Sequence, residues 1–284
     1  MKNIDLSHLV GKDISIALKE AQELSAKNLE GKIHAHKIYN FLLDQIPNEY
    51  SESKFHVLRG ILREKIWDNE RIFFWNEKFF SQAGQDKVIK NHFFPNKKNG
   101  FFLEIGAYDG IEGSNCFHFE KFLNWNGIAF EPSKVQYEKL KNNRNCKILN
   151  KAISNSIVEV DFVEVIEGLT QMSGIKNENY TAENIIKKNG QSKTEISKII
   201  TTTFDQEVSS DQEIDYLSID IEGGELSVLE TIDFEKYTIK VVSVENNLPD
   251  KFNFNSFFIS KNFSFFDRVG QDEIFYNNSH FKLN

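Results

Sequence analysis

The spacing of apolar residues divides the chain into two parts. From residue 13 to residue 80 apolar positions recur at steps of three and four, the period of an amphipathic helix, and no strand-like alternation interrupts them. We therefore expect residues 1–80 to form a helical extension built around a helical hairpin. From residue 81 short apolar runs alternate with polar or amphipathic segments, as in a parallel sheet with crossover helices.

Five of these apolar runs predict the strands of the sheet, at residues 101–105, 127–131, 146–152, 215–220 and 239–245. Strict alternation in SIVEVDFVEV predicts an added antiparallel strand. FSFFDRV and EIFYN are joined by a link so short that only an antiparallel hairpin can form. The polar stretch 166–200 is too long for an ordinary connection, and it could be a lid, an acceptor-binding insert or a solvated helical excursion.

Together these elements predict an α/β fold. A mostly parallel, Rossmann-like sheet closed by an antiparallel hairpin is the arrangement of class I methyltransferases, whereas a dinucleotide-binding domain normally keeps its last strand parallel. We assign residues 81–284 to a domain of this class, with residues 1–80 as its N-terminal helical extension.

Composition limits the classes of function. A chain of 284 residues is long enough for one such domain and a smaller extension, and its formal net charge of −8 opposes diffuse binding to nucleic acid. No apolar run approaches the roughly 18 residues of a membrane span, and no N-terminal stretch has the layout of a signal peptide. We expect a cytoplasmic protein with no nucleic-acid partner and no membrane span.

The segment FFLEIGAYDGIEGSN, residues 101–115, carries the first candidate site. Gly106 and Gly110 let the backbone turn sharply after a strand and approach a ligand closely. Glu104 on the strand and Asp109 in the loop would repel the pyrophosphate of a dinucleotide, but they suit a cofactor with a cationic amine and a sulfonium. The turn therefore favours S-adenosylmethionine as the cofactor.

Acids at the ends of two further predicted strands support this interpretation. Glu131 ends the second strand, where a carboxylate can accept hydrogen bonds from both hydroxyls of a ribose. Asp220 and Glu222 end the fourth strand, just before two glycines. Because ligands of open α/β sheets bind outside the carboxyl ends of the strands, we expect these acids to face the same pocket.

Five blocks occur in an order that is similar to a known family: SQAGQD, FLEIGAYDGIEGSN, WNGIAFEPS, LNKAIS and YLSIDIEGGEL. Through them residues 80 to 277 resemble the FkbM family of S-adenosylmethionine-dependent methyltransferases, and the helical first part lies outside the resemblance. The chain departs from the usual pattern at Tyr108, commonly Asn in relatives, and at Cys116, commonly Thr.

The resemblance implies a role for several residues around the cofactor. Gly106 and Asp109 would cradle its methionine end, Ser114 would bind its carboxylate, and Gln82 would close over the same end. The residues from Asn150 to Ala152 would border the adenine. The candidate cofactor contacts are thus Gln82, Glu104, Gly106, Asp109, Gly110, Ser114, Glu131, Asn150 and Ala152.

The resemblance also implies methyl transfer to a hydroxyl, on a sugar, nucleotide-sugar or glycan of a bacterial surface or on a secondary metabolite. A hydroxyl acceptor must lose its proton, so a general base is needed. Asp220 is the candidate base, and Glu222 and Glu245 are its candidate catalytic support.

A more specific hypothesis is that this region binds a divalent cation. VVSVENN places Glu245 and Asn246 at the end of the fifth strand, next to the end of the fourth. Metal-dependent O-methyltransferases of the catechol type use an acid after the fourth strand and an acid and amide pair after the fifth. Asp220, Glu245 and Asn246 could therefore bind Mg²⁺ or Mn²⁺, the alternative being a hydrogen-bonded acidic cluster.

Three other classes of function stay open. A nucleic-acid methyltransferase fits the glycine turn, but the chain lacks a D/N-P-P-Y or Pro-Cys catalytic motif. A nicotinamide oxidoreductase fits an α/β sheet, but the acidic loop argues against it. The chain could also be a non-catalytic S-adenosylmethionine-binding or protein-interaction module. The helical extension could equally form a homodimer contact or part of the acceptor pocket.

Overall fold

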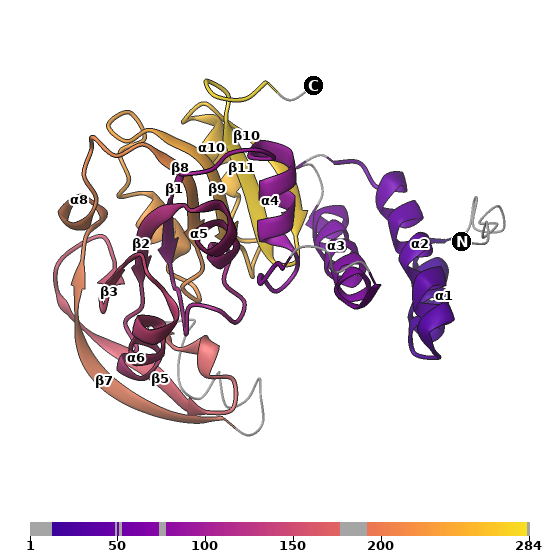
Figure 1. Ribbon diagram of the computed structural model, residues 1–284, viewed down its shortest axis with the longest axis horizontal. Helices are drawn as coiled ribbons and strands as arrows, with labels where there is room; N and C mark the ends of the chain where they lie inside the picture. The colour runs from indigo at the N-terminus through magenta and orange to yellow at the C-terminus, as the bar shows by residue number, and fades with distance from the viewer. Residues whose placement is uncertain (1–12, 49, 51–52, 74–77, 177–191, 283–284) are drawn as a thin grey trace.

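A seven-stranded sheet is the centre of the computed structural model, which describes residues 13–48, 50, 53–73, 78–176 and 192–282 (Figure 1). In chain order its strands are β1 (Phe101–Ile105), β2 (Asn126–Phe130), β3 (Lys147–Leu149), β8 (Ile214–Ile219), β9 (Ile239–Glu245), β10 (Phe263–Val269) and β11 (Asp272–Asn277).

The order of these strands across the sheet is β10-β11-β9-β8-β1-β2-β3. The five strands from β9 to β3 are parallel to one another, whereas β11 is antiparallel to both of its neighbours, β9 and β10. This arrangement confirms the predicted fold class, a mostly parallel Rossmann-like sheet closed by an antiparallel hairpin.

Helices cover both faces of the sheet because successive strand residues point to opposite sides. On one face Phe102 packs in a core with residues of α4 (Gln85–Phe93), α5 (Phe117–Leu123) and α6 (Lys134–Asn143). On the other face Leu103 packs in a core with residues of α8 (Phe204–Glu207), α9 (Glu225–Leu229) and α10 (Phe254–Ile259). The two cores hold the carboxyl ends of the parallel strands in a fixed arrangement.

A second sheet, of four strands in the order β4-β7-β5-β6, lies beside the first. Its strands are β4 (Ala152–Ile153), β5 (Glu159–Glu167), β6 (Gly174–Ile175) and β7 (Lys193–Thr202). The predicted antiparallel strand is confirmed in β5, which pairs antiparallel with both β6 and β7.

One predicted strand in this region was wrong, and so was one of the alternatives for the stretch 166–200. The strand predicted at residues 146–152 is divided between β3 and β4, which belong to different sheets, because the chain turns away at Asn150. The stretch 166–200 contains the end of β5, all of β6 and most of β7, and its described residues form strands, short connections and the 3₁₀ helix η2 (Thr170–Met172) instead of a helical excursion. Residues 177–191 of that stretch lie outside the described part.

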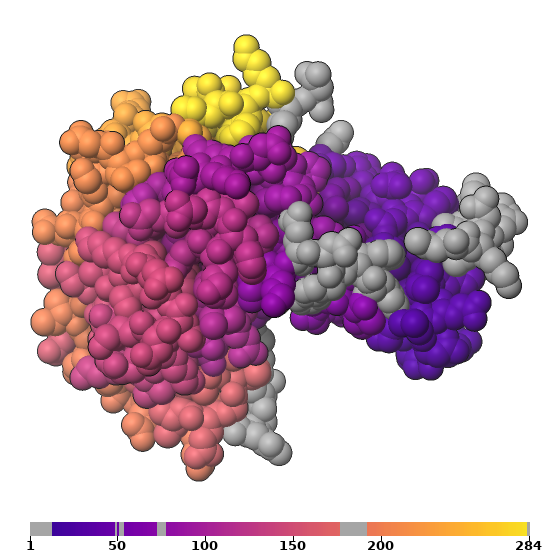
Figure 2. Space-filling view, in the orientation of Figure 1, coloured from indigo at the N-terminus to yellow at the C-terminus, as the bar shows by residue number. Residues whose placement is uncertain are grey.

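The predicted helical extension is confirmed as α1 (Ile14–Ser25), α2 (Leu29–Gln45) and α3 (Ser53–Phe73), so a third helix follows the expected hairpin. Buried residues of these helices form a separate small core, among them Ala21, Ile38 and Leu62. In the space-filling view the helices project as a lobe from one side of the molecule (Figure 2). None of the described helices is both long and apolar enough to cross a bilayer.

Buried charges join α3 to the hairpin of β10 and β11. Arg59 Nε donates to Asp267 Oδ1 at 2.9 Å, and Arg63 Nη2 donates to Asp267 Oδ2 at 2.6 Å. His56 Nε2 lies 2.8 Å from Glu273 Oε1, and both side chains are buried. The helical extension is therefore fixed to the edge of the sheet by specific polar contacts.

Candidate active site at the carboxyl ends of the strands

A pocket of about 660 Å³ lies at the carboxyl ends of β1, β2, β8 and β9. This is the edge at which open α/β sheets bind their ligands. Residues 169 and 171–175, between β5 and the end of β6, form a further wall. The candidate residues that line the pocket are Gln82, Glu104, Gly106, Ser114, Glu131, Ala152, Asp220, Glu222 and Glu245.

Four other candidates, Asp109, Gly110, Asn150 and Asn246, are not among the described residues that line the pocket. The hydrogen bonds and packing of these four residues, described below, show that each stabilises the surrounding structure. The structure thus brings most of the candidate residues together around one pocket, and it places these four outside the pocket lining.

Gly106 is the residue at which β1 turns into the pocket. Its φ of +90° lies in the left-handed region, and a Cβ on it would lie 1.8 Å from the carbonyl oxygen of Asp220. The backbone N–H groups of Gly106 and Ala107 both donate to the carbonyl oxygen of Phe130, at 3.1 and 2.9 Å. The glycine therefore lets the turn close against the ends of β2 and β8.

Asp109 and Gly110 build the loop instead of facing the ligand space. Oδ1 of Asp109 accepts the backbone N–H groups of Ile111 and Glu112, each at 2.9 Å, which is a local turn typical of aspartate. A Cβ on Gly110 would lie 2.7 Å from Cγ of Arg144, so this glycine packs against the end of α6. The predicted contacts of these two residues to a cofactor are corrected accordingly.

Glu104 is held by a buried arginine. Arg144 Nη1 donates to Glu104 Oε2 at 2.7 Å, and Arg144 Nε donates to Glu120 Oε2 at 2.6 Å. Ser114 Oγ donates to Glu104 Oε1 at 2.7 Å and accepts the backbone N–H of Phe117 at 3.0 Å. The charge of Glu104 is thus balanced inside the protein, and the hydroxyl proton of Ser114 is engaged by Glu104.

Glu131 presents a buried carboxyl group to the pocket. Its Oε2 accepts the backbone N–H of Tyr108 at 2.8 Å, and its Oε1 accepts the backbone N–H of Ser133 at 2.7 Å. Burial raises the pKa of Glu131 to about 8, although these two hydrogen bonds act in the opposite direction. Each oxygen keeps a second lone pair for a hydroxyl of a ligand.

Asn150 lies behind Glu131 and supports the end of β2. Its Nδ2 donates to the carbonyl oxygens of Glu131 and Pro132, at 2.8 and 3.0 Å. The predicted contact of Asn150 to an adenine is corrected for this reason, whereas Ala152, two residues later, lines the pocket.

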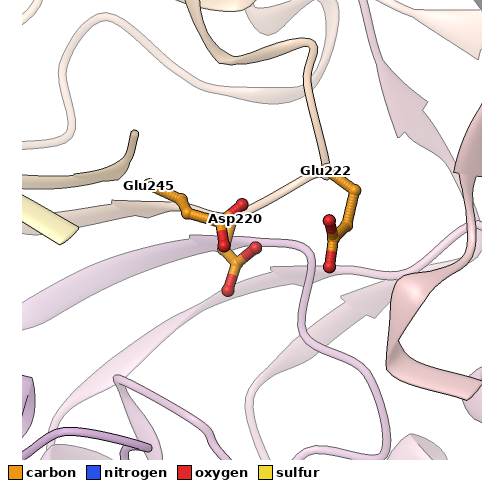
Figure 3. A group of neighbouring side chains, drawn as sticks. All are labelled: Asp220, Glu222 and Glu245. Carbon is orange, nitrogen blue, oxygen red and sulfur yellow. The ribbon is translucent and has the colours of Figure 1, made fainter. Parts of the chain in front are cut away.

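Asp220, Glu222 and Glu245 form a group of acids at the ends of β8 and β9 (Figure 3). One carboxylate oxygen of each lies within 4.8 Å of those of the other two. Burial and the neighbouring acids raise the pKa values of Asp220 and Glu245 well above the ordinary values. Glu222 has a φ of +59°, which is uncommon for a residue other than glycine and marks a conformation that the fold imposes.

Asn246 lies apart from this group although it follows Glu245 directly. Its Nδ2 donates to Glu273 Oε1 at 2.8 Å and to the carbonyl oxygen of Phe252 at 3.0 Å, and its Oδ1 accepts the backbone N–H of Leu248. Successive residues at a strand end point to opposite sides, so only Glu245 reaches the pocket. The prediction that Asn246 belongs to a metal site is corrected, and Glu222 is the third acid.

No local sequence pattern marks Arg144, because its partner Glu104 is distant along the chain. Asn115 and Asp272 also lie beside the acids, and no sequence motif marks either of them as a site residue. Asn115 Nδ2 donates to Ser218 Oγ at 3.0 Å and to Asp272 Oδ2 at 3.2 Å. Burial raises the pKa of Asp272 to about 6. The position of Asn115 at the end of the glycine-containing segment 101–115 is the one sequence feature that could have indicated it as a site residue.

The residues of this site lie within a known protein family. The family model described as "Methyltransferase FkbM domain" matches residues 104–269 of the chain. No curated protein matches the chain.

Among solved structures, the chain is similar to methyltransferase FkbM from Methylobacillus flagellatus KT, with 11% identity and a TM-score of 0.42 over 84% of this chain and 57% of that chain. A methyltransferase from Pyrococcus furiosus has 15% identity and a TM-score of 0.37 over 76% of this chain and 95% of that chain. The chain thus spans little more than half the length of the Methylobacillus protein.

The family assignment depends on the domain model alone. The matched region begins at Glu104 on β1 and ends at Val269 on β10, so it contains the glycine turn, Glu131 and the three acids. Because this match covers more than half of its residues, the chain belongs to the FkbM methyltransferase family.

Proposed function

We propose that this chain uses S-adenosylmethionine to methylate a hydroxyl group of a saccharide. Its family supports a methyltransferase activity. The observation that carries the choice of cofactor is Glu131, a buried carboxyl group that lines the pocket beside the glycine turn and accepts backbone N–H groups at both oxygens.

The residues of the pocket fit this cofactor. Among the described residues, no ion pair involves Glu131, so its remaining lone pairs suit the neutral hydroxyls of a ribose. Ala152 and Ile153 line the pocket near the ends of β2 and β3 and offer an apolar surface to a flat base. When bound, S-adenosylmethionine would supply an electrophilic methyl group on a sulfonium.

The chain's own task is then to hold the acceptor in line and to take up its proton. Proximity and orientation alone can contribute roughly 7 to 11 kcal/mol to such a displacement. In its ionised form Asp220 would accept the proton of the acceptor hydroxyl, and general-base catalysis of this kind typically contributes about 10² to 10⁴-fold to the rate. Glu222 and Glu245 would orient that hydroxyl, since both carboxylates line the pocket beside Asp220.

The charge of the pocket favours a neutral saccharide over one that carries a phosphate. Of the described residues that line the pocket, Lys151 is the single cation, and its Nζ lies 2.5 Å from Glu207 Oε1. The acids that line the pocket would repel a phosphate group. A nucleotide-sugar is thus a weaker candidate acceptor than a neutral glycan or glycoside.

Calorimetric titration of the purified full chain with S-adenosylhomocysteine, S-adenosylmethionine and NADH tests the cofactor. We expect micromolar binding of the two sulfur nucleosides, no binding of NADH, and loss of binding in Glu131→Ala. The matched control is Glu138→Ala, which changes an exposed acid on the following helix and should leave binding intact. Absence of binding to well-folded protein would contradict the proposal. Cofactor binding without turnover on any hydroxylated acceptor would favour a non-catalytic binding module.

A further inference from the structure

Two buried oxygen atoms that line the pocket lack a hydrogen-bond donor among the described residues. They are Oε2 of Glu245 and Oδ1 of Asn115, on side chains that are 8% and 6% exposed. A buried acceptor that stays without a donor destabilises the folded state, because it has lost its hydrogen bonds to water. In native structures such an atom marks a bound water or ion, a catalytic role or a site of strain.

The orientation of Asn115 is fixed by its neighbours. Its Nδ2 donates to Ser218 on β8 and to Asp272 on β11, so its Oδ1 is the end that is left for another partner. Asp272 pairs with Glu245 across the antiparallel strands β11 and β9. The two oxygens that lack a hydrogen-bond donor therefore lie in the same region, where β8, β9 and β11 meet.

From this we infer that Asp220, Glu222 and Glu245 form a binding site for a divalent cation of the Mg²⁺ or Mn²⁺ class. The three carboxylates offer hard oxygen ligands, which these ions prefer over nitrogen or sulfur. Two oxygens on opposite sides of a bound Mg²⁺ lie about 4.2 Å apart. At most one pair of the three ligands can lie opposite, and neighbouring ligands lie about 2.9 Å apart. The three carboxylate oxygens, which lie within 4.8 Å of one another, would therefore draw together around the ion.

The loop that holds Glu222 gives the third ligand its place. Glu222 and Gly223 both have positive φ, of +59° and +110°, and Gly223 N donates to Glu225 Oε1 at 2.9 Å. This turn directs the Glu222 carboxylate towards the same space as Asp220 and Glu245 (Figure 3). The inference rests on the proposed function in one respect, since the cation would leave a ligand position for the oxygen of the acceptor hydroxyl.

The test uses the full chain, freed of metal with a chelator, and Mn²⁺ as the probe. Electron paramagnetic resonance measures the free Mn²⁺, with and without saturating S-adenosylhomocysteine. We expect one bound Mn²⁺ per chain, displaced by Mg²⁺, and affinity weakened by about 10- to 100-fold in Glu245→Gln and Glu222→Gln. The matched control is Glu112→Gln, which changes an acid that lines the same pocket outside the group and should keep the affinity.

The amide variants keep the shape of the side chain and remove a negative charge from a crowded site, so we expect them to fold with an equal or higher Tm. Absence of bound Mn²⁺ in the wild type, or equal affinity in Glu245→Gln, would overturn the cation site. Calorimetry with S-adenosylhomocysteine on the same protein separates the two proposals. Nucleoside binding without Mn²⁺ would overturn only the cation site and would mean that the acids serve an amine or a hydroxyl.

Discussion

Nη1 of Arg144, at the end of α6, donates to Oε2 of Glu104, on the central strand β1, across 2.7 Å in the interior of the protein. The guanidinium also pairs with Glu120 on α5. One cation thus balances two buried acids directly beneath the glycine turn, and its removal would leave both charges without a partner.

We predict that Arg144→Met lowers the free energy of unfolding by about 3 to 5 kcal/mol, the usual cost of breaking a buried pair from one side. Urea denaturation followed by circular dichroism measures this change. Lys141→Met is the control, because Lys141 lies exposed on the same helix and should change stability by less than about 0.5 kcal/mol. Equal stabilities of the two variants would show that Glu104 has another source of compensation.

The pKa of Glu131 predicts a pH dependence of cofactor binding. With its pKa raised to about 8 by burial, this carboxyl group is protonated in the free protein at neutral pH. Ribose hydroxyls that donate to it favour the ionised form, so binding should release a proton below pH 8. We expect affinity for S-adenosylhomocysteine to rise by up to about tenfold per pH unit and to level off above pH 8.

Calorimetry in buffers of different ionisation enthalpy measures the released proton directly. Glu131→Gln provides the control, because an amide does not titrate and the pH dependence should vanish with it. The free energy of unfolding should change in the opposite direction. Because the pKa of Glu131 is raised from 4.5 to about 8 on folding, the protein should lose stability progressively as the pH increases between these two values.

We predict that Gly106→Ala is more harmful than Gly113→Ala. Both glycines have positive φ, so both substitutions carry a similar backbone cost. The new Cβ at residue 106 would also lie 1.8 Å from Asp220 O, whereas the nearest atom to a Cβ at residue 113 is Cγ of Gln82 at 3.4 Å. The difference in unfolding free energy should be about 1 to 3 kcal/mol in favour of Gly113→Ala. Equal urea midpoints would contradict the close approach of the two strand ends.

Docking of the helical extension gives a further prediction. Asp267→Ala leaves Arg59, which is buried, without its carboxylate partner, so we expect a loss of about 3 to 5 kcal/mol and faster cleavage in α3 under limited proteolysis. Asp68→Ala removes an exposed partner of Lys65 and Arg71 on the same helix and should cost at most about 1 kcal/mol. An unchanged proteolysis pattern in Asp267→Ala would mean that apolar packing alone holds α3.

The charge of the pocket predicts the acceptor preference. A set of neutral methyl glycosides should be methylated faster than the same sugars linked to a nucleoside diphosphate, because Lys151 is engaged by Glu207. Transfer of a labelled methyl group in parallel reactions measures the ratio. Lys151→Ala should change neither rate by more than about threefold; faster transfer to the nucleotide-sugars would reverse the assignment of the substrate class.

Features with a local cause were predictable from the sequence. The strand at residues 239–245 is found as β9 with the same bounds, because every residue but one in it is buried and the apolar run ends at an acid. Glu131, Asp220, Glu222 and Glu245 line one pocket because parallel strands end at the same edge of a sheet.

Features that depend on distant partners were not predictable. The sequence predicts that Asp109 contacts the cofactor, but in the structure its carboxylate accepts the backbone N–H groups of Ile111 and Glu112 and forms the turn. The apolar pattern does not reveal β7 because most of its residues are exposed, and its pairing with β5 makes it a strand. From its position at the end of a polar helix, Arg144 would be expected on the surface. In the structure it is buried, because it pairs with Glu104 on β1.

The antiparallel placement of β11 has a consequence for how the protein is made. Among the described strands β11 comes last in the sequence, yet it lies between β9 and β10 and brings Asp272 next to Glu245. On the ribosome the other described strands emerge first, so the edge of β9 that pairs with β11 stays open until β11 follows. During synthesis most of the core residues are therefore available before β11 closes this edge of the sheet beside Glu245.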